Sequence, residues 1–136
     1  MTNLFLDTDV ILDFLGNRRP FSKLAARIFI DAHGGKFRIH TSANTVTIVY
    51  YILCKSVEDR KARALITDLL EFINIIPVTE KILKHALKSS FKDFEDAVQH
   101  ECALTEDYIK YIVTRNLKDY KKSKIKAVGP EQVFKI

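Results

Sequence analysis

The sequence predicts an α/β fold, a three-layer α/β/α sandwich with a central parallel sheet of about five strands. Short apolar segments alternate with longer segments whose apolar residues recur at helical spacing, which is typical of strand–helix–strand crossovers. The chain has 136 residues, of which 47% are hydrophobic and 29% charged, an ordinary globular composition. With no repeat, low-complexity tract or linker, residues 1–136 are expected to form a single domain.

The first predicted strand covers 3–7 (NLFLD), an apolar run that ends in an acid. A helical turn over 11–15 follows, in which Asp13 lies between two apolar residues and is expected on the helix surface. Pro20 fits the first turn of a new helix, because its fixed φ suits that position and its missing N–H is not needed there. Apolar residues at helical spacing extend this helix over 21–33.

The second predicted strand covers 37–40 (FRIH). Thr41 and Ser42 are residue types that cap helices, and they are expected to open a helix that runs to about Lys55. Another helix with an apolar face is expected over 56–72.

Capping residues mark the two helices of the second half of the chain. Thr79 is expected to begin a helix through Lys88, and Asp93 one through about Leu104. Three further apolar segments complete the predicted sheet, at 73–78, 111–114 and 125–128.

No apolar run approaches the roughly 20 residues that a membrane helix needs, so no contact with a membrane is expected. The N-terminal segment lacks the basic leader of a signal peptide. The two cysteines, Cys54 and Cys102, lie far apart and fit no metal-binding spacing. We therefore expect a reduced protein of the cytoplasm.

Residues 110–126 hold the excess positive charge. This segment carries seven of the 22 lysine and arginine residues and one acid, whereas the whole chain has a net charge of +5. Such a cluster can bind a polyanion. The alternative for an isolated lysine run is a solvated surface without a ligand.

Acidic residues are expected to converge at the carboxyl ends of the strands, where open parallel sheets bind their ligands. Asp7 and Asp9 follow the first strand, and Asp93 and Asp96 begin the helix before the fourth strand, three residues apart on one face. Carboxylates held together favour a hard cation such as Mg²⁺ or Mn²⁺. Alternatively, Asp93 and Asp96 serve only as a helix cap and its capping-box partner.

Four sequence stretches in this order resemble the motifs of the PIN domain family, the fold of VapC-type toxin ribonucleases. They are FLDTDVILDFL, DFEDAVQHECA, IVTRNLKDY and GPEQVF. The DFEDA and IVTRN forms are most similar to a bacterial subgroup of that family, and the resemblance extends over the whole chain.

The resemblance implies roles for individual acids. Asp7 matches the first metal ligand and Asp96 the third acid, with Asp93 as an auxiliary ligand on the same helix face. Asn116 stands where many members have the fourth acid and can coordinate through its amide oxygen. These four residues are the expected catalytic set.

The family's second acid has no counterpart in this sequence. Its expected place falls at about Ile48, in the stretch TSANTVTIVYYIL. Asn44, Thr45 or Thr47 can supply a neutral oxygen there or hold a water.

The resemblance implies a metal-dependent endoribonuclease that uses Mg²⁺ or Mn²⁺, acts as a toxin restrained by an antitoxin, and forms homodimers. The backbone of the RNA substrate would be held by positive charge. The basic residues expected to do so are Arg115, Lys118, Lys121, Lys122 and Lys124. Two alternatives remain open. One is a degenerate PIN-like nucleic-acid-binding module without catalysis, and the other is a phosphotransfer domain of receiver type.

Overall fold

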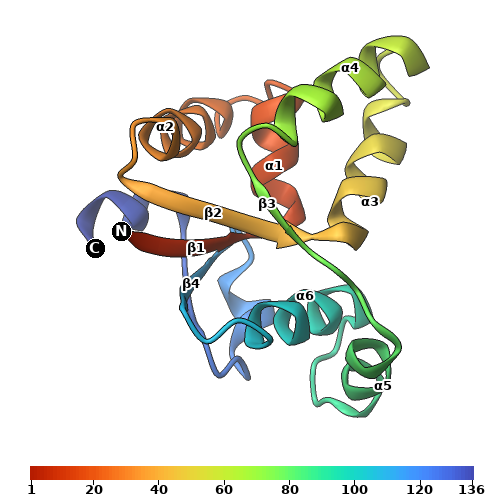
Figure 1. The fold of residues 1–136 in the computed structure, drawn as a ribbon, viewed down its shortest axis with the longest axis vertical. Coiled ribbons are helices and arrows are strands. Elements are labelled where there is room, and N and C mark those ends of the chain that lie inside the picture. The colour runs from red at the N-terminus through yellow and green to blue at the C-terminus, as the bar shows by residue number, and fades with distance from the viewer.

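A computed structural model describes all residues of the chain, 1–136 (Figure 1). Five strands, all parallel, form one sheet in the order β3-β2-β1-β4-β5. Their bounds are β1 (Thr2–Leu6), β2 (Phe37–Ser42), β3 (Asn74–Ile76), β4 (Ile109–Val113) and β5 (Lys126–Val128). The predicted parallel α/β fold is confirmed.

Helices cover both faces of the sheet, as Figure 1 shows. Four of them pack on one face: α1 (Thr8–Leu15), α2 (Ser22–His33), α3 (Ala43–Leu53) and α4 (Asp59–Leu69). On the other face lie α5 (Glu80–Lys88) and α6 (Phe94–Leu104). Two short 3₁₀ helices, η1 (Leu117–Tyr120) and η2 (Pro130–Lys135), follow β4 and β5. No helix has both the length and the apolar character that a membrane crossing requires.

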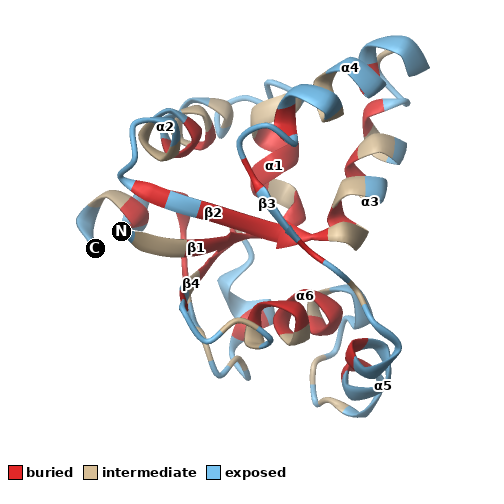
Figure 2. Cartoon of the chain, viewed as in Figure 1, coloured by how far each residue is buried: buried red, intermediate tan, exposed pale blue.

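The central strand β1 explains why the sheet has two cores. Its side chains alternate in direction, so Leu4 and Leu6 enter the core beneath α1–α4, whereas Phe5 enters the core beneath α5 and α6. All three side chains are fully buried. Figure 2 shows the buried strands between helices whose outer faces are exposed. Because both faces are covered, the strand reads as a continuous apolar run.

The structure differs from the prediction at element ends. Thr41 is not a cap but belongs to β2, and its hydroxyl donates to the backbone oxygen of Leu6 at 2.9 Å. Ser42 is the cap, since its side chain accepts from the backbone N–H of Thr45. Thr79 and Asp93 cap their helices as predicted. The two 3₁₀ helices were not predicted, because four to six residues carry too little periodicity.

The order of the strands places a crevice at one edge of the sheet. From β1 the chain moves outward through β2 and β3, and then returns to add β4 and β5 on the other side of β1. The connections therefore diverge beyond the carboxyl ends of β1 and β4, which is where such sheets bind ligands.

A candidate acidic centre

Asp7 lies at the carboxyl end of β1 and begins helix α1 as its N-cap. One carboxylate oxygen accepts from the backbone N–H of Thr8 at 2.8 Å, and the other accepts from the Thr114 hydroxyl, beyond β4, also at 2.8 Å. The side chain is 5% exposed. Burial raises the pKa of Asp7, and the hydrogen bonds from Thr114 and Thr8 oppose that rise. Asp7 is thus a fixed, desolvated carboxylate at the switch point.

Asp96 lies near the start of α6, opposite Asp7. Asp93 caps this helix by accepting from the backbone N–H of Asp96 at 2.9 Å. Burial and then the negative charges of Asp7 and Asp93 raise the pKa of Asp96 to about 7. After burial, the charge of Asp7 is the next largest cause of this rise, so α6 brings Asp96 into the electrostatic field of Asp7.

Asp9 and Asn116 form a second pair at the same edge. The Asn116 side-chain amide donates to Asp9 Oδ2 at 3.1 Å, and the backbone N–H of Arg115 donates to the same oxygen at 3.3 Å. Asp9 Oδ1 is buried and has no hydrogen-bond partner. Burial and then the charge of Asp7 raise the pKa of Asp9 to about 7.

The raised pKa of Asp96 predicts that the free energy of unfolding depends on pH when EDTA keeps the chain free of divalent cations. Above about pH 4 the unfolded chain releases the proton of Asp96, whereas the folded chain keeps it up to about pH 7. The folded state therefore loses stability between about pH 4 and 7. Asp96→Asn removes this loss, so its Tm should exceed the wild-type Tm by a margin that grows from pH 4 to 7 and then levels. Thermal unfolding of both chains measures the margin, in which the titrating groups that do not interact with Asp96 cancel.

The matched control for this measurement is Asp107→Asn, which changes an exposed acid in the turn before β4, at the opposite edge of the sheet. The same measurement on Asp107→Asn gives the effect of losing an exposed carboxylate. A margin for Asp96→Asn that does not grow between pH 4 and 7 would mean that the pKa of Asp96 is not raised in the folded chain.

The donor atoms at this edge fit a hard divalent cation. No three acidic, histidine or cysteine side chains lie close enough together to hold a metal ion by themselves. Mg²⁺ nevertheless keeps several waters and binds proteins through one or two carboxylates. Asp7 and Asp96 supply such oxygens, and the unpartnered Oδ1 of Asp9 is an additional acceptor. A cation would also offset the burial and the negative charge of Asp7 that raise the pKa values of Asp9 and Asp96.

A buried polar network lies behind Asp7 and was not predicted. Gln99, on α6, accepts a hydrogen bond from Ser42 and donates to Thr45 and, at 3.3 Å, to Thr8. All four side chains are buried. The network ties α1, α3 and α6 together, which fixes Asp96 relative to Asp7. One signal could have identified Gln99, which lies one turn after Asp96 on the same face of the helix.

Tyr120 is a second buried group that the sequence did not reveal. Its hydroxyl is buried without a hydrogen-bond partner. Burial and then the negative charges of Asp7 and Asp96 raise its pKa, so the hydroxyl lies near the acids. Ile48, near which the resemblance predicts the family's second acid, is half-buried. Neither Thr45 nor Thr47 has a free hydroxyl, because Thr45 belongs to the Gln99 network and Thr47 donates to the backbone oxygen of Asn44.

The predicted basic residues divide into two groups. The four lysines are exposed and take part in no ion pair. Three of them line a cleft of about 340 Å³ between η1 and the start of α6. Its complete lining is Ser90, Phe91, Lys92, Asp93, Lys118, Asp119, Lys121 and Lys122. The lysine-rich segment therefore lies directly beside the acidic edge.

Arg115 has a different environment. Its guanidinium donates two hydrogen bonds to Asp13, at 2.7 and 3.2 Å, and lies 3.8 Å from the centre of the Phe21 ring. Asp13 is 1% exposed and also pairs with Arg18, so its predicted place on the helix surface was wrong. Arg115 neutralises an acid that α1 would otherwise bury alone. A contact between Arg115 and RNA stays a prediction.

The fold places this chain among the open parallel α/β domains, which bind their ligands at the switch point of the sheet, and here Asp7, Asp9 and Asp96 lie at that edge. A family model described as "PIN domain" matches residues 3–118. The chain therefore belongs to the PIN domain family, and the resemblance of its motifs is confirmed.

Known relatives agree with this assignment. The chain is 31% identical over 108 residues to "Ribonuclease VapC1" of Aquifex aeolicus (strain VF5), covering 76% of this chain and 74% of that protein. Two solved structures share the fold. VapBC2 from Rickettsia felis, bound to a DNA fragment from its promoter, has a TM-score of 0.70 at 15% identity and covers 94% and 98% of the two chains. A toxin–antitoxin complex from Klebsiella pneumoniae has a TM-score of 0.65 at 21% identity, and the match covers 93% of this chain and 97% of that chain.

Proposed function

We propose that this chain is an endoribonuclease that hydrolyses phosphodiester bonds of RNA with the help of Mg²⁺ or Mn²⁺. The observation that supports this most is the convergence of acids at one edge of the sheet, where burial and then the charge of Asp7 raise the pKa of both Asp9 and Asp96. The similarity to a protein named Ribonuclease VapC1 supports RNA as the substrate. Under this proposal Asp7 and Asp96 hold the cation, with Asp93 and Asn116 as auxiliary or catalytic partners.

The cation, when bound, supplies an activated water and neutralises charge on the scissile phosphate. The chain's own residues fix and shield the site. Two hydrogen bonds hold the Asp7 carboxylate and fix its orientation before a substrate binds. The Gln99 network sets the position of α6, and therefore of Asp96, without contacting the substrate.

The activity is tested by incubating the purified chain with single-stranded RNA in Mn²⁺, in Mg²⁺ and in EDTA. We expect internal cleavage with either cation and none in EDTA. Absence of cleavage under all three conditions would contradict the proposed activity.

A second candidate function is a PIN-like module that binds nucleic acid without cleaving it. The specific observation in its favour is Ile48, an apolar side chain at the place of the family's second acid. Binding of RNA in the cleavage experiment, with intact RNA recovered in the presence of Mn²⁺, would favour this alternative over the enzyme.

The exposed lysines of the segment 110–126 are proposed to hold the RNA backbone by charge. Replacing Lys121, Lys122 and Lys124 by glutamine should weaken binding and lower the salt dependence, by about 0.7 in the slope of log K against log salt for each lysine that contacts a phosphate. Filter binding at several salt concentrations, with the Asp7→Asn chain to prevent cleavage, measures the slope.

The control replaces three exposed lysines away from the acidic edge: Lys36, Lys55 and Lys61. Both triple variants lose the same charge, so only a local contact can separate them. Equal slopes for the two triple variants would show that the segment does not touch RNA.

We further propose a protein partner of antitoxin type. The Klebsiella pneumoniae neighbour is a toxin–antitoxin complex. The chain has an apolar groove of about 370 Å³ on its surface, and exposed apolar surface of this kind is typical of a site that binds another protein. Its walls include Phe14, Leu15, Phe29, Leu69 and Phe72. Co-expression with the product of the neighbouring open reading frame tests this, with a stable complex and loss of cleavage expected.

The homodimer stays a prediction, which sedimentation equilibrium tests.

A further inference from the structure

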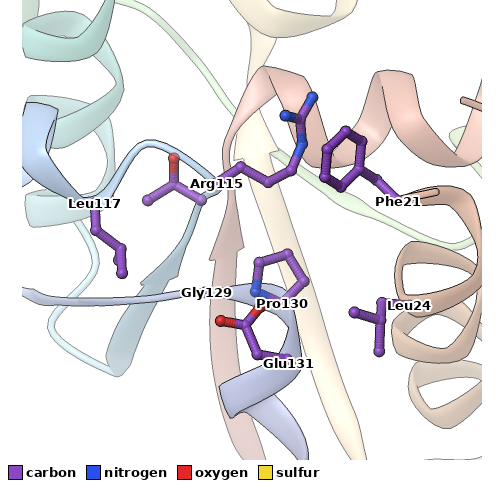
Figure 3. Close-up of a pocket in the computed structure, with 8 residues that line it drawn as sticks. Phe21, Leu24, Arg115, Leu117, Gly129, Pro130 and Glu131 are labelled. Atoms are coloured by element: carbon purple, nitrogen blue, oxygen red, sulfur yellow. The ribbon is translucent and has the colours of Figure 1, made fainter. Parts of the chain in front are cut away.

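A second cavity, of about 370 Å³, opens at the same edge of the sheet on the side away from the lysine cleft (Figure 3). Three segments that are distant in sequence line it: the start of α2, the residues after β4, and the turn from β5 into η2. The lining residues are Phe21, Leu24, Thr114, Arg115, Leu117, Gly129, Pro130 and Glu131. Thr114 also donates to the Asp7 carboxylate, so the cavity shares a wall with the acidic centre.

One wall of this cavity is flat and rigid. The Arg115 guanidinium lies over the Phe21 ring, and its two hydrogen bonds to Asp13 prevent it from moving away (Figure 3). Phe21 is nonetheless 39% exposed, and Leu117 on the other side is 41% exposed. Unpaired nucleobases stack on exposed aromatic rings such as Phe21, and an exposed aliphatic side chain such as Leu117 can pack against the other side of a base.

The floor of the cavity carries one acid, Glu131. Its carboxylate folds over Gly129, where an added Cβ would come within 2.6 Å of Glu131 Oε1. The turn is held by the backbone N–H of Gly129, which donates to the Gln132 side chain at 2.7 Å. Glu131 has no hydrogen-bond donor and no cation paired with it. A carboxylate repels phosphates, so its presence here suits a ligand group that offers N–H donors.

We propose that this cavity binds the guanine base of a nucleotide near the scissile phosphate, and that Glu131 selects it. Guanine presents two adjacent donors, N1–H and the N2 amino group, which match the two oxygens of one carboxylate. Adenine, cytosine and uracil each place an acceptor beside the donor on that edge, and the acceptor would face Glu131. The inference rests on the proposed ribonuclease function and adds base selection to it.

Cleavage of a random single-stranded RNA pool, followed by sequencing of the new ends, tests the proposal. The wild type should show guanine enriched at one fixed position relative to the cut. Glu131→Gln replaces one acceptor by a donor and should reduce this enrichment by about fivefold or more, as expected for a bidentate contact to a base. Gly129→Ala should also reduce the enrichment, because the added Cβ would displace the Glu131 carboxylate. The backbone should be unaffected, since the φ of −75° and ψ of 160° at Gly129 suit alanine.

The matched control is Glu71→Gln, an exposed acid at the end of α4, which should leave the guanine enrichment unchanged. Unchanged enrichment in both cavity variants, or cleavage by the wild type without base preference, would overturn the role of Glu131 while leaving the ribonuclease intact.

Nucleotide binding separates the two proposals if no cleavage is found. In ¹H–¹⁵N spectra, GMP should shift the backbone amides of Leu117, Gly129 and Glu131, whereas UMP should not. Glu131→Gln should lose the GMP shifts. Shifts of this kind in an inactive chain would support the cavity and contradict the ribonuclease, and no GMP shifts would overturn the cavity.

Discussion

The Asp7→Asn chain is expected to fold and to cleave RNA at least about a hundredfold more slowly than the wild type, the scale of losing one group that supports charge stabilisation in a transition state. Asparagine has nearly the shape of aspartate and keeps an oxygen for the Thr8 backbone N–H. The Thr114 hydroxyl, which donates to Asp7, can turn and accept from the new amide. The substitution therefore removes the charge and leaves the fold.

The comparison is made with initial cleavage rates in Mn²⁺, after the Tm of each chain has been measured. Asp96→Asn should lose activity in the same way, because its carboxylate lies in the field of Asp7. Asp107→Asn, the same change at the opposite edge of the sheet, should retain the wild-type rate. If Asp7→Asn and Asp96→Asn both cleave as fast as Asp107→Asn, the acidic centre is not the active site.

Asp13→Asn should cost about 3 kcal/mol in the free energy of unfolding, near the lower end of what breaking a buried ion pair costs. Asp13 is 1% exposed, and it accepts two hydrogen bonds from Arg115 and pairs with Arg18. Asparagine cannot neutralise the guanidinium that remains. Urea unfolding of the wild-type and Asp13→Asn chains measures the difference.

The matched control for Asp13→Asn is Asp59→Asn, which breaks an exposed pair with Arg63 on α4. Exposed pairs contribute little to stability, so this variant should unfold close to the wild type. The double variant Asp13→Asn with Arg115→Met should recover part of the loss, because no charge is left buried without its partner. Equal losses in Asp13→Asn and Asp59→Asn would show that the Arg115 pair is not a buried support.

The sequence was sufficient for features that depend on neighbouring residues. The apolar segments located all five strands, and Thr79 and Asp93 were recognised as helix caps because capping involves only three or four residues. Asp7 was identifiable because a carboxylate at the end of a buried strand loses its hydration and needs a hydrogen-bonding or cationic partner.

Contacts between distant residues could not be predicted from local patterns. Asp13 occupies a polar position in a helix, and only the arrival of Arg115, 102 residues later, explains why it is buried. Gln99 likewise has three partners that come from α1, α3 and the end of β2. Tyr120 was part of a lysine-rich segment whose charge concealed a buried side chain.

The cation site at the acidic edge is best tested by measuring how tightly the chain binds Mn²⁺. The chain is added stepwise to a Mn²⁺ solution, and electron paramagnetic resonance measures the free ion that remains. The wild type and Asp107→Asn should both remove Mn²⁺ from solution, whereas Asp7→Asn and Asp96→Asn should bind it much more weakly. This result would show that Asp7, at the carboxyl end of β1, and Asp96, at the start of α6, form a cation site. Equal binding by all four chains, or none by the wild type, would contradict it.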